Sequence, residues 1–147
     1  MIQTSYFGNL VNLTSTVIAI CGKSPEWFYG KGFEYKKLAP RWAFFKDYKD
    51  GIIGPEEYTR LYHELVVGKL DPNVVLRELI ELNGGSDDIV LVCYETPNEF
   101  CHRNLVAKWL SDNCGITITE ANYNGSRKES SGMSSDDKRK LRVSFIG

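Results

Sequence analysis

Reactive side chains gather in one short segment of this chain, LVCYETPNEFCHRNLVAKWL. They are Cys93, Glu95, Cys101, His102 and Arg103. A cysteine beside a helix N-terminus and a cation is favoured as its thiolate, the nucleophilic form. A neighbouring carboxylate can act as a general acid or base. Cys93 and Glu95 are therefore candidate catalytic groups, and Cys101, His102 and Arg103 are candidate ligand contacts.

Each of these residues also has a purely structural interpretation. Free cysteine is among the most buried residue types, so Cys93 could be a core residue of a strand. His102 falls on the apolar face of the helix predicted there, where a histidine is commonly a hydrogen-bonded packing residue. Glu95 could be pinned by Arg103 and fix its loop. The residue types alone leave these alternatives open.

Several familiar kinds of site do not fit the spacing. A phosphatase loop needs an arginine six residues after the cysteine, but position 99 is a glutamate. Zinc ligands usually come in pairs about two to four residues apart, whereas Cys93 and Cys101 are eight apart, and Cys101 and His102 would diverge as neighbours on a helix. The GKS at 22–24 lacks the upstream glycine of a phosphate loop, and no dinucleotide fingerprint occurs. We predict no metal and no cofactor.

Apolar runs bounded by turn residues predict the strands of a sheet. TVIAICG at 16–22 and DDIVLVCYE at 87–95 are β-branched runs typical of buried strands. GITITEA at 115–121 alternates more, and TSYFGNL at 4–10 is shorter. These four segments are the predicted strands.

Three segments carry helical spacing together with start signals. GPEEYTRLYHELVVGKL, at 54–70, has a proline and acidic residues in its first turn. DPNVVLRELIELNGG, at 71–85, opens with Asp71 as a candidate N-cap. TPNEFCHRNLVAKWLSDNCG, at 96–115, begins with Thr96 three residues before Glu99, which is the spacing of a capping box. The third helix is therefore predicted to start just after Thr96.

Strands alternating with helices predict an α/β fold, a three-layer sandwich with a mainly parallel sheet. Cys21 and Cys93 each stand at the carboxyl end of a predicted strand. Because ligands of open parallel sheets bind outside those ends, the two loops are expected to face one crevice. The first loop contributes the candidate ligand contacts Cys21, Gly22, Lys23 and Ser24. The positive end of the helix after Thr96 favours an anionic ligand there.

Residues 27–49, the aromatic-basic segment, hold nine of the eighteen aromatic residues, interleaved with six cations. Such a mixture suits base stacking and phosphate contact. It equally suits a cover loop that packs its rings on the sheet edge. We assign Tyr29 and Tyr35 to the pocket, and the segment supports an alternative function, a non-catalytic module that binds nucleic acid or a protein.

Composition sets the remaining expectations. The 147 residues carry 18 basic and 19 acidic side chains, a net charge of -1 that predicts no bulk attraction to nucleic acid or membrane. No export signal or bilayer-length apolar run occurs, so we expect a cytoplasmic protein with four free thiols. One α/β domain is predicted for 1–122. The polar, serine-rich extension at 123–147 is expected to be disordered or to return as an edge strand through LRVSFIG.

The block Cys-Tyr-Glu, a proline loop and then Cys-His-Arg resembles the bacterial and phage family called domain of unknown function 488. GKSPEWFYGKGFEYKKLAP and WAFFKDYK, upstream, are also similar to members of that family, and the resemblance spans about residues 3 to 112. It implies a compact α/β domain with its signature residues around one pocket. The expected function is binding of a small anionic, nucleotide-like ligand in the crevice, with any chemistry performed by Cys93 and Glu95.

Overall fold

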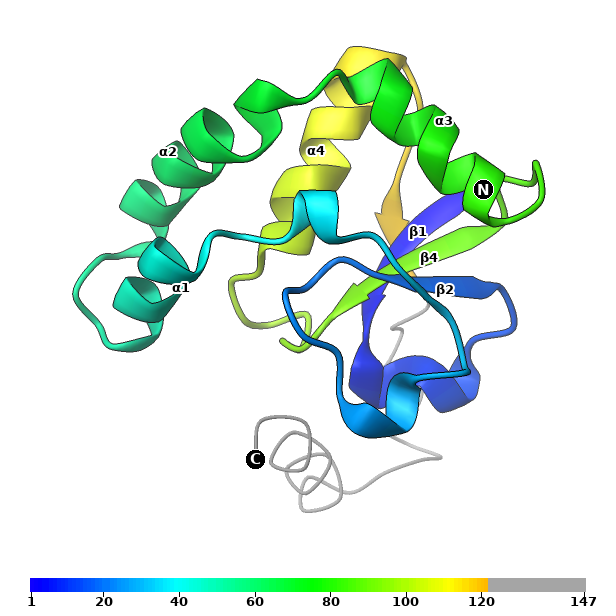
Figure 1. Ribbon diagram of the computed structural model, residues 1–147, viewed down its shortest axis with the longest axis horizontal. Coiled ribbons are helices and arrows are strands. Elements are labelled where there is room, and N and C mark those ends of the chain that lie inside the picture. Colours follow the sequence, from blue (N-terminus) through cyan, green and yellow to red (C-terminus); the bar gives the residue numbers. More distant parts are fainter. Residues whose placement is uncertain (122–147) are drawn as a thin grey trace.

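The structure is a computed structural model that describes residues 1–121, and these residues form one sheet with helices packed on it (Figure 1). The extension predicted for 123–147, with its candidate edge strand, lies outside the described residues. Within the described part, no helix has both the length and the apolar character that crossing a bilayer requires.

The sheet has five strands in the order β3-β2-β4-β1-β5, and each neighbouring pair is parallel. Their bounds are β1 (Ile2–Tyr6), β2 (Thr16–Ala19), β3 (Phe33–Glu34), β4 (Ile89–Cys93) and β5 (Thr119–Glu120). The predicted α/β class and parallel sheet are confirmed. Four of the strands overlap predicted segments, although β5 is shorter than its segment and β1 begins two residues before its segment and ends at Tyr6. β3 has only two residues, too few to show a strand period in the sequence.

The described residues form four α-helices. Between β3 and β4 lie α1 (Trp42–Lys49), α2 (Pro55–Leu65) and α3 (Pro72–Leu82), and between β4 and β5 lies α4 (His102–Cys114). The predicted cap of α3 is confirmed, since the Asp71 side chain accepts a hydrogen bond from the backbone N–H of Asn73 at 2.9 Å. α1 was not predicted as a helix, because it lies in the aromatic-basic segment and has no side-chain cap.

Alternate residues of the strands enter two separate cores, as the period of two requires. Ile18, Ile89 and Leu91 face the α-helices, which cover one side of the sheet (Figure 1). Val17, Ala19, Val90 and Val92 belong to the second core. That core is closed by Phe7 and Phe28, from the 3₁₀ helices η1 (Phe7–Asn12) and η2 (Glu26–Phe28). The third layer of the sandwich is thus built from short 3₁₀ turns in the described residues.

Two further 3₁₀ turns connect the helices to the sheet and to one another. They are η3 (Lys36–Leu38) and η4 (Val67–Lys69). Each carries one fully or nearly fully buried apolar residue, Leu38 and Val67, into the core on the α-helical side. The Tyr62 hydroxyl donates a hydrogen bond to the Leu38 carbonyl at 2.6 Å and ties α2 to η3.

Candidate functional site

The strands β2 and β4 are neighbours, with Ala19 opposite Val92 in the register. One step further, the backbone N–H of Ile20 donates to the Val92 carbonyl at 3.0 Å. The loops that follow the two strands therefore leave the sheet at the same edge. Both strands thus belong to one sheet, as the predicted crevice requires, and they are direct neighbours in it.

The start of α4 differs from the prediction and changes the site. One of the two capping-box contacts forms, since the Thr96 N–H donates to Glu99 Oε1 at 3.1 Å. The Thr96 hydroxyl donates to the same oxygen at 3.2 Å, and the Glu99 N–H donates to the Thr96 carbonyl at 3.0 Å. They close only a turn, and the helix begins at His102 after an extended Cys101 (φ -150°, ψ 145°). The Phe100 ring packs on Tyr48 and Tyr58. This tertiary contact prevails over the local cap and keeps Phe100 and Cys101 out of the helix.

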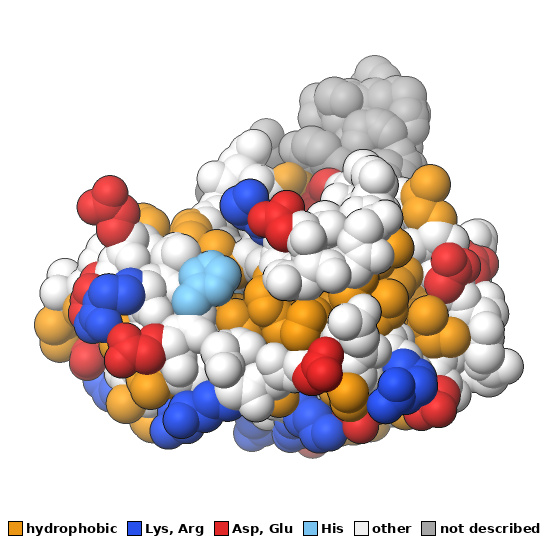
Figure 2. All heavy atoms as spheres, turned by 90° about the horizontal axis from the view of Figure 1, so that it is seen from above, with side chains coloured by type: hydrophobic (Ala, Val, Ile, Leu, Met, Phe, Trp, Pro, Cys, Tyr) orange, Lys and Arg blue, Asp and Glu red, His pale blue; other side chains and the backbone are white. Residues whose placement is uncertain are grey.

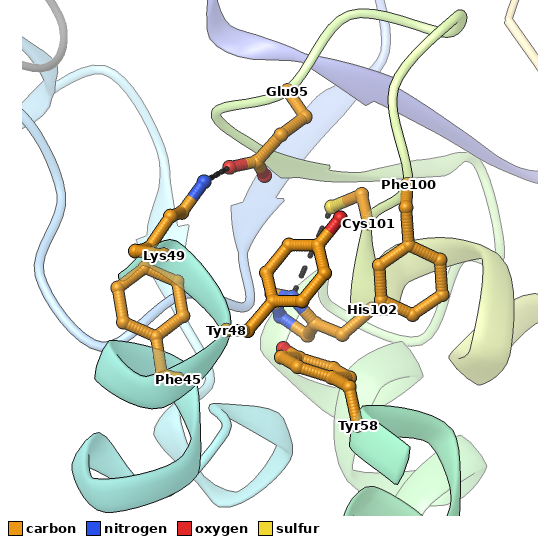
Figure 3. A pocket seen from close by; sticks show the side chains of 8 residues that line it. All are labelled: Phe45, Tyr48, Lys49, Tyr58, Glu95, Phe100, Cys101 and His102. Atoms are coloured by element: carbon orange, nitrogen blue, oxygen red, sulfur yellow. Dashed lines mark hydrogen bonds and ion pairs between the residues drawn. The ribbon is translucent and has the colours of Figure 1, made fainter. Parts of the chain in front are cut away.

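A pocket opens between the N-terminus of α4, the end of β4 and the helices α1 and α2 (Figure 3). Its lining residues are Phe45, Tyr48, Lys49, Tyr58, Glu95, Phe100, Cys101 and His102. The rings of Tyr48, Tyr58 and Phe100 gather around His102, while Glu95 and Lys49 reach toward each other at one side (Figure 3). The pocket thus combines an aromatic wall with a charged side and the sulfur of Cys101.

Glu95 is bound to Lys49 rather than to Arg103. Lys49 Nζ lies 2.6 Å from Glu95 Oε2, and the pair spans from α1 to the loop after β4. The proposed pinning of the Glu95 carboxylate by Arg103 is wrong, since Arg103 contacts only the backbone carbonyl of Glu95, at 2.6 Å. The Glu95 carboxylate is a candidate general acid or base. In this structure it is paired with Lys49, which an anionic ligand could displace.

Arg103 is fully buried and lies beneath the site. Its Nε and Nη2 donate to the two carboxylate oxygens of Glu120 at 3.3 and 3.1 Å. Its Nη1 donates to Cys93 Sγ at 3.2 Å. Arg103 was a candidate ligand contact, but the structure places it away from the pocket wall. The sequence could not show this burial, because the partner of Arg103, Glu120, lies on β5, a separate element.

His102 is buried, and its imidazole is oriented by the neighbouring strand. Nε2 lies 2.7 Å from the Ile20 carbonyl, so it is the protonated nitrogen and Nδ1 carries the lone pair. Burial lowers the pKa of His102 to about 4, which keeps the ring neutral at physiological pH. Nδ1 lies 3.8 Å from Cys101 Sγ. His102 therefore presents an acceptor nitrogen beside the Cys101 sulfur in the pocket.

The sulfur atoms of Cys93 and Cys101 are in direct contact, as in a disulfide. Cys93 is not among the lining residues and reaches the pocket only through Cys101. Cys21 and Cys114 are free thiols, so the expectation of four free thiols is wrong for one pair. The contact arises because β4 ends at Cys93 while the extended Cys101 returns to the same edge.

The loop after β2 forms its own cluster near this edge. Ser24 is buried and donates to Glu34 Oε2 at 2.7 Å, while the Tyr94 hydroxyl donates to the Lys23 carbonyl at 2.6 Å. Burial raises the pKa of the Cys21 thiol to about 11, so the thiol stays protonated. The predicted contacts of this loop lie next to β4 but do not line the pocket: Cys21, Gly22, Lys23 and Ser24.

The two tyrosines assigned to the pocket lie elsewhere. Tyr35 is buried, and its hydroxyl bonds the carboxylate of Glu78 on α3. Tyr29 is 52% exposed and is not a lining residue. The aromatic residues that do line the pocket include Phe45 and Tyr48, which sequence reasoning placed in a loop. Their spacing of three, with Lys49 four after Phe45, is the helical signal that could have found them.

Comparison with protein-family models matches residues 28–114 to the model described as the active DUF488-N3 subclade. The matched stretch contains every pocket residue and both signature blocks, Cys-Tyr-Glu and Cys-His-Arg. No curated protein matches the chain, and no solved structure does.

Proposed function

This chain belongs to the DUF488 family, and from that premise we propose that its pocket binds a small anionic, nucleotide-like ligand. The observation that carries the proposal is the pairing of an aromatic wall with a lysine. Phe45, Tyr48 and Phe100 offer ring faces for a planar base, while Lys49 offers a cation for a phosphate or carboxylate. The N-terminus of α4, which has no side-chain cap, lies at the same place and adds the positive end of its dipole.

The size of the pocket limits what can enter. Its inner space of about 10 Å³ holds about one water molecule, far below the roughly 300–1,000 Å³ typical of sites for drug-sized ligands. A ligand therefore lies mainly at the mouth of the pocket, or the lining side chains move to admit it. We propose a ligand no larger than a mononucleotide, bound mainly at the mouth.

Chemistry, if the ligand undergoes any, involves the thiol and carboxylate groups at the pocket. Cys101 lines the pocket beside the His102 lone pair, and Cys93 contacts Cys101. Glu95 becomes available as an acid or base once a ligand anion takes over Lys49. We place this activity in the cytoplasm, where small-molecule thiols keep such cysteines reduced.

Binding of nucleoside monophosphates tests the proposal directly. Isothermal titration of the purified full chain with each common nucleoside monophosphate, and with inorganic phosphate, measures affinity and selectivity. Lys49→Gln removes the pocket cation and should weaken binding of a nucleotide by about tenfold or more, since a charge-assisted hydrogen bond contributes roughly 1.5–3 kcal/mol.

Lys46→Gln is the matched control on the same helix, because Lys46 pairs with Asp50 and does not line the pocket. This variant should bind like the wild-type chain. Absence of binding by every nucleotide, or equal losses in the two variants, contradicts the proposal. Mass spectrometry of small molecules that co-purify with the wild-type chain then identifies the natural ligand class.

The alternative function is a nucleic-acid or protein binding module formed by the aromatic-basic segment. One observation favours it, since this segment holds most of the exposed large rings, Trp27, Tyr29, Phe33 and Trp42. The cations of the segment support this function less, because Lys37, Lys46 and Lys49 are paired with acidic side chains. On the face seen in Figure 2, basic and acidic side chains intermingle around an apolar area, with no stripe of one sign.

Salt dependence separates these two functions. Affinity for a nucleic acid falls steeply as salt rises, because each neutralised phosphate releases counterions. A mononucleotide in a partly enclosed pocket neutralises one phosphate and should lose less affinity. Titrations with a single-stranded oligonucleotide and with a mononucleotide at low and high salt therefore distinguish them.

A further inference from the structure

Three ligand-type atoms converge at the inner end of the pocket. The sulfurs of Cys93 and Cys101 and a ring nitrogen of His102 all lie within 4.8 Å of one another, and all three residues are buried. The three side chains come from the end of β4, the residue before α4 and the first residue of α4. A buried set of two thiols and one imidazole is the ligand chemistry of zinc.

The sequence predicts no zinc site because Cys93 and Cys101 are eight residues apart and because Cys101 and His102 are expected to be successive residues of a helix. They are not, because Cys101 is extended and only His102 is helical. Cys101 Sγ lies 3.8 Å from His102 Nδ1. With a Zn–S bond of about 2.3 Å and a Zn–N bond of about 2.0 Å, tetrahedral geometry needs these two atoms roughly 3.5 Å apart. The existing separation is close to that value.

The two cysteines are also spaced for a shared ion. Their Cα atoms are 7.7 Å apart, beyond the roughly 4.4–6.8 Å usual for a disulfide. Two zinc-bound sulfurs stand roughly 3.8 Å apart in tetrahedral geometry. The backbone separation lets the sulfurs move apart to that distance by side-chain rotation.

The surroundings match the outer shell of a metal site. A metal-bound histidine almost always donates its other ring N–H to a carboxylate, a carbonyl or water, and His102 Nε2 is bonded to the Ile20 carbonyl. Arg103 donates to Cys93 Sγ, which stabilises negative charge on that sulfur. Glu120 in turn balances the Arg103 charge. The sulfur and nitrogen atoms are thereby oriented before any ion arrives.

We propose that Cys93, Cys101 and His102 Nδ1 form a three-residue site for a thiophilic divalent cation, zinc above all, with its fourth position open to the pocket. Two molecules of a small-molecule thiol first reduce the cysteine pair to two thiols and are themselves oxidised to one disulfide. The cation then displaces the two thiol protons, which pass to water. Only the fourth position rests on the proposed function, because there a ligand anion or a water molecule completes the tetrahedron.

Cobalt is the probe for this site, since tetrahedral Co²⁺–thiolate centres absorb strongly. The full chain is reduced, and a chelator removes any bound metal. Reductant and chelator are then removed under anaerobic conditions, and the chain is titrated with Co²⁺. We expect one Co²⁺ per chain, a thiolate-to-cobalt charge-transfer band and loss of that band when Zn²⁺ is added. Cys93→Ser and Cys101→Ser should each weaken the band and lower cobalt affinity at least tenfold, and His102→Asn should lower affinity likewise.

Cys114→Ser is the control, because Cys114 is a free thiol at the other end of α4. It should leave cobalt binding unchanged. Should a site variant fail to fold, zinc protection in the wild-type chain gives the answer. Added Zn²⁺ should then slow alkylation of Cys93 and Cys101, but not of Cys114, as mapped by mass spectrometry.

Failure of the reduced chain to take up cobalt or zinc, or unchanged uptake by Cys93→Ser, overturns the proposal. A cysteine pair that re-forms its disulfide and excludes the metal under thiol-reducing conditions overturns it as well. The nucleotide titrations of the chelated wild-type chain and of Lys49→Gln are separate measurements. Failure of the metal proposal therefore does not affect the test of nucleotide binding, and failure of nucleotide binding does not affect the test of the metal site.

Discussion

Arg103 is the residue on which the buried part of the site depends. Its side chain has no solvent exposure, whereas its partner Glu120 keeps 23%. It also bonds the Glu95 carbonyl and Cys93 Sγ, so it connects β5, β4 and the loop between β4 and α4. A buried cation of this kind needs its counter-charge far more than an exposed one does.

Glu120→Gln should therefore destabilise the fold by about 3 kcal/mol, because it leaves Arg103 buried without a counter-charge. Glu95→Gln is the comparison. It breaks a pair whose lysine is 44% exposed, and we expect a loss below about 1 kcal/mol. Urea denaturation gives both free energies of unfolding. Equal effects of the two substitutions would show that Arg103 does not rely on Glu120.

Cys21 offers a test of the second core at the residue scale. Burial raises its pKa to about 11 from an ordinary 9.0. Because iodoacetamide reacts with the thiolate, the labelling rate of Cys21 should keep rising about tenfold per pH unit from pH 8 to pH 10. Mass-spectrometric mapping measures this rate, and a plateau near pH 9 would contradict the raised pKa.

Ionisation of Cys21 also makes the stability of the fold depend on pH. The unfolded chain releases the Cys21 proton near pH 9.0, while the folded chain holds it to about pH 11. Stability from this residue is complete below pH 9 and falls as pH rises through that interval. Circular dichroism at each pH therefore checks that labelling reports the folded chain.

At the scale of elements, local signals fixed α3 but not α4. Asp71 caps α3 as its sequence predicts, since the cap needs only residues 71–73. At Thr96 the Glu99 carboxylate accepts a hydrogen bond from the Thr96 N–H, yet α4 starts six residues later, at His102. The difference is Phe100, whose ring enters the aromatic cluster of α1 and α2.

The cap of α3 can be tested by two substitutions at one position. Asp71→Ala removes the acceptor of the Asn73 N–H and should cost about 1 kcal/mol of unfolding free energy. Asp71→Asn keeps an acceptor at the same place and should cost only a few tenths. Chemical denaturation compares the two variants, and an equally large loss in Asp71→Asn would show that the charge of Asp71 matters more than its cap.

For the described part of the molecule, the two faces of the sheet have different roles. The α-helices cover one face and build the pocket wall, and the 3₁₀ turns η1 and η2 close the other over a smaller core. The pocket lies where α1, α2 and the start of α4 meet the loop that follows β4. Its position is therefore a consequence of topology, as expected for a parallel sheet.

The amino-acid sequence by itself determined the α/β class, the main strands, the cap of α3 and the segment with the reactive groups. These follow from local periodicity and turn chemistry, which need no partner distant in sequence. Cys101 and His102 were also identified as site residues in this way. Both line the pocket.

Only the tertiary structure decided which of these groups meet. Lys49 pairs with Glu95 across 46 positions, and Arg103 pairs with Glu120 from a strand that local signals barely mark. The same long-range packing holds Cys101 extended, which turns its sulfur toward His102 and Cys93. Contacts of this kind depend on side chains from separate elements, and no spacing within one segment encodes them.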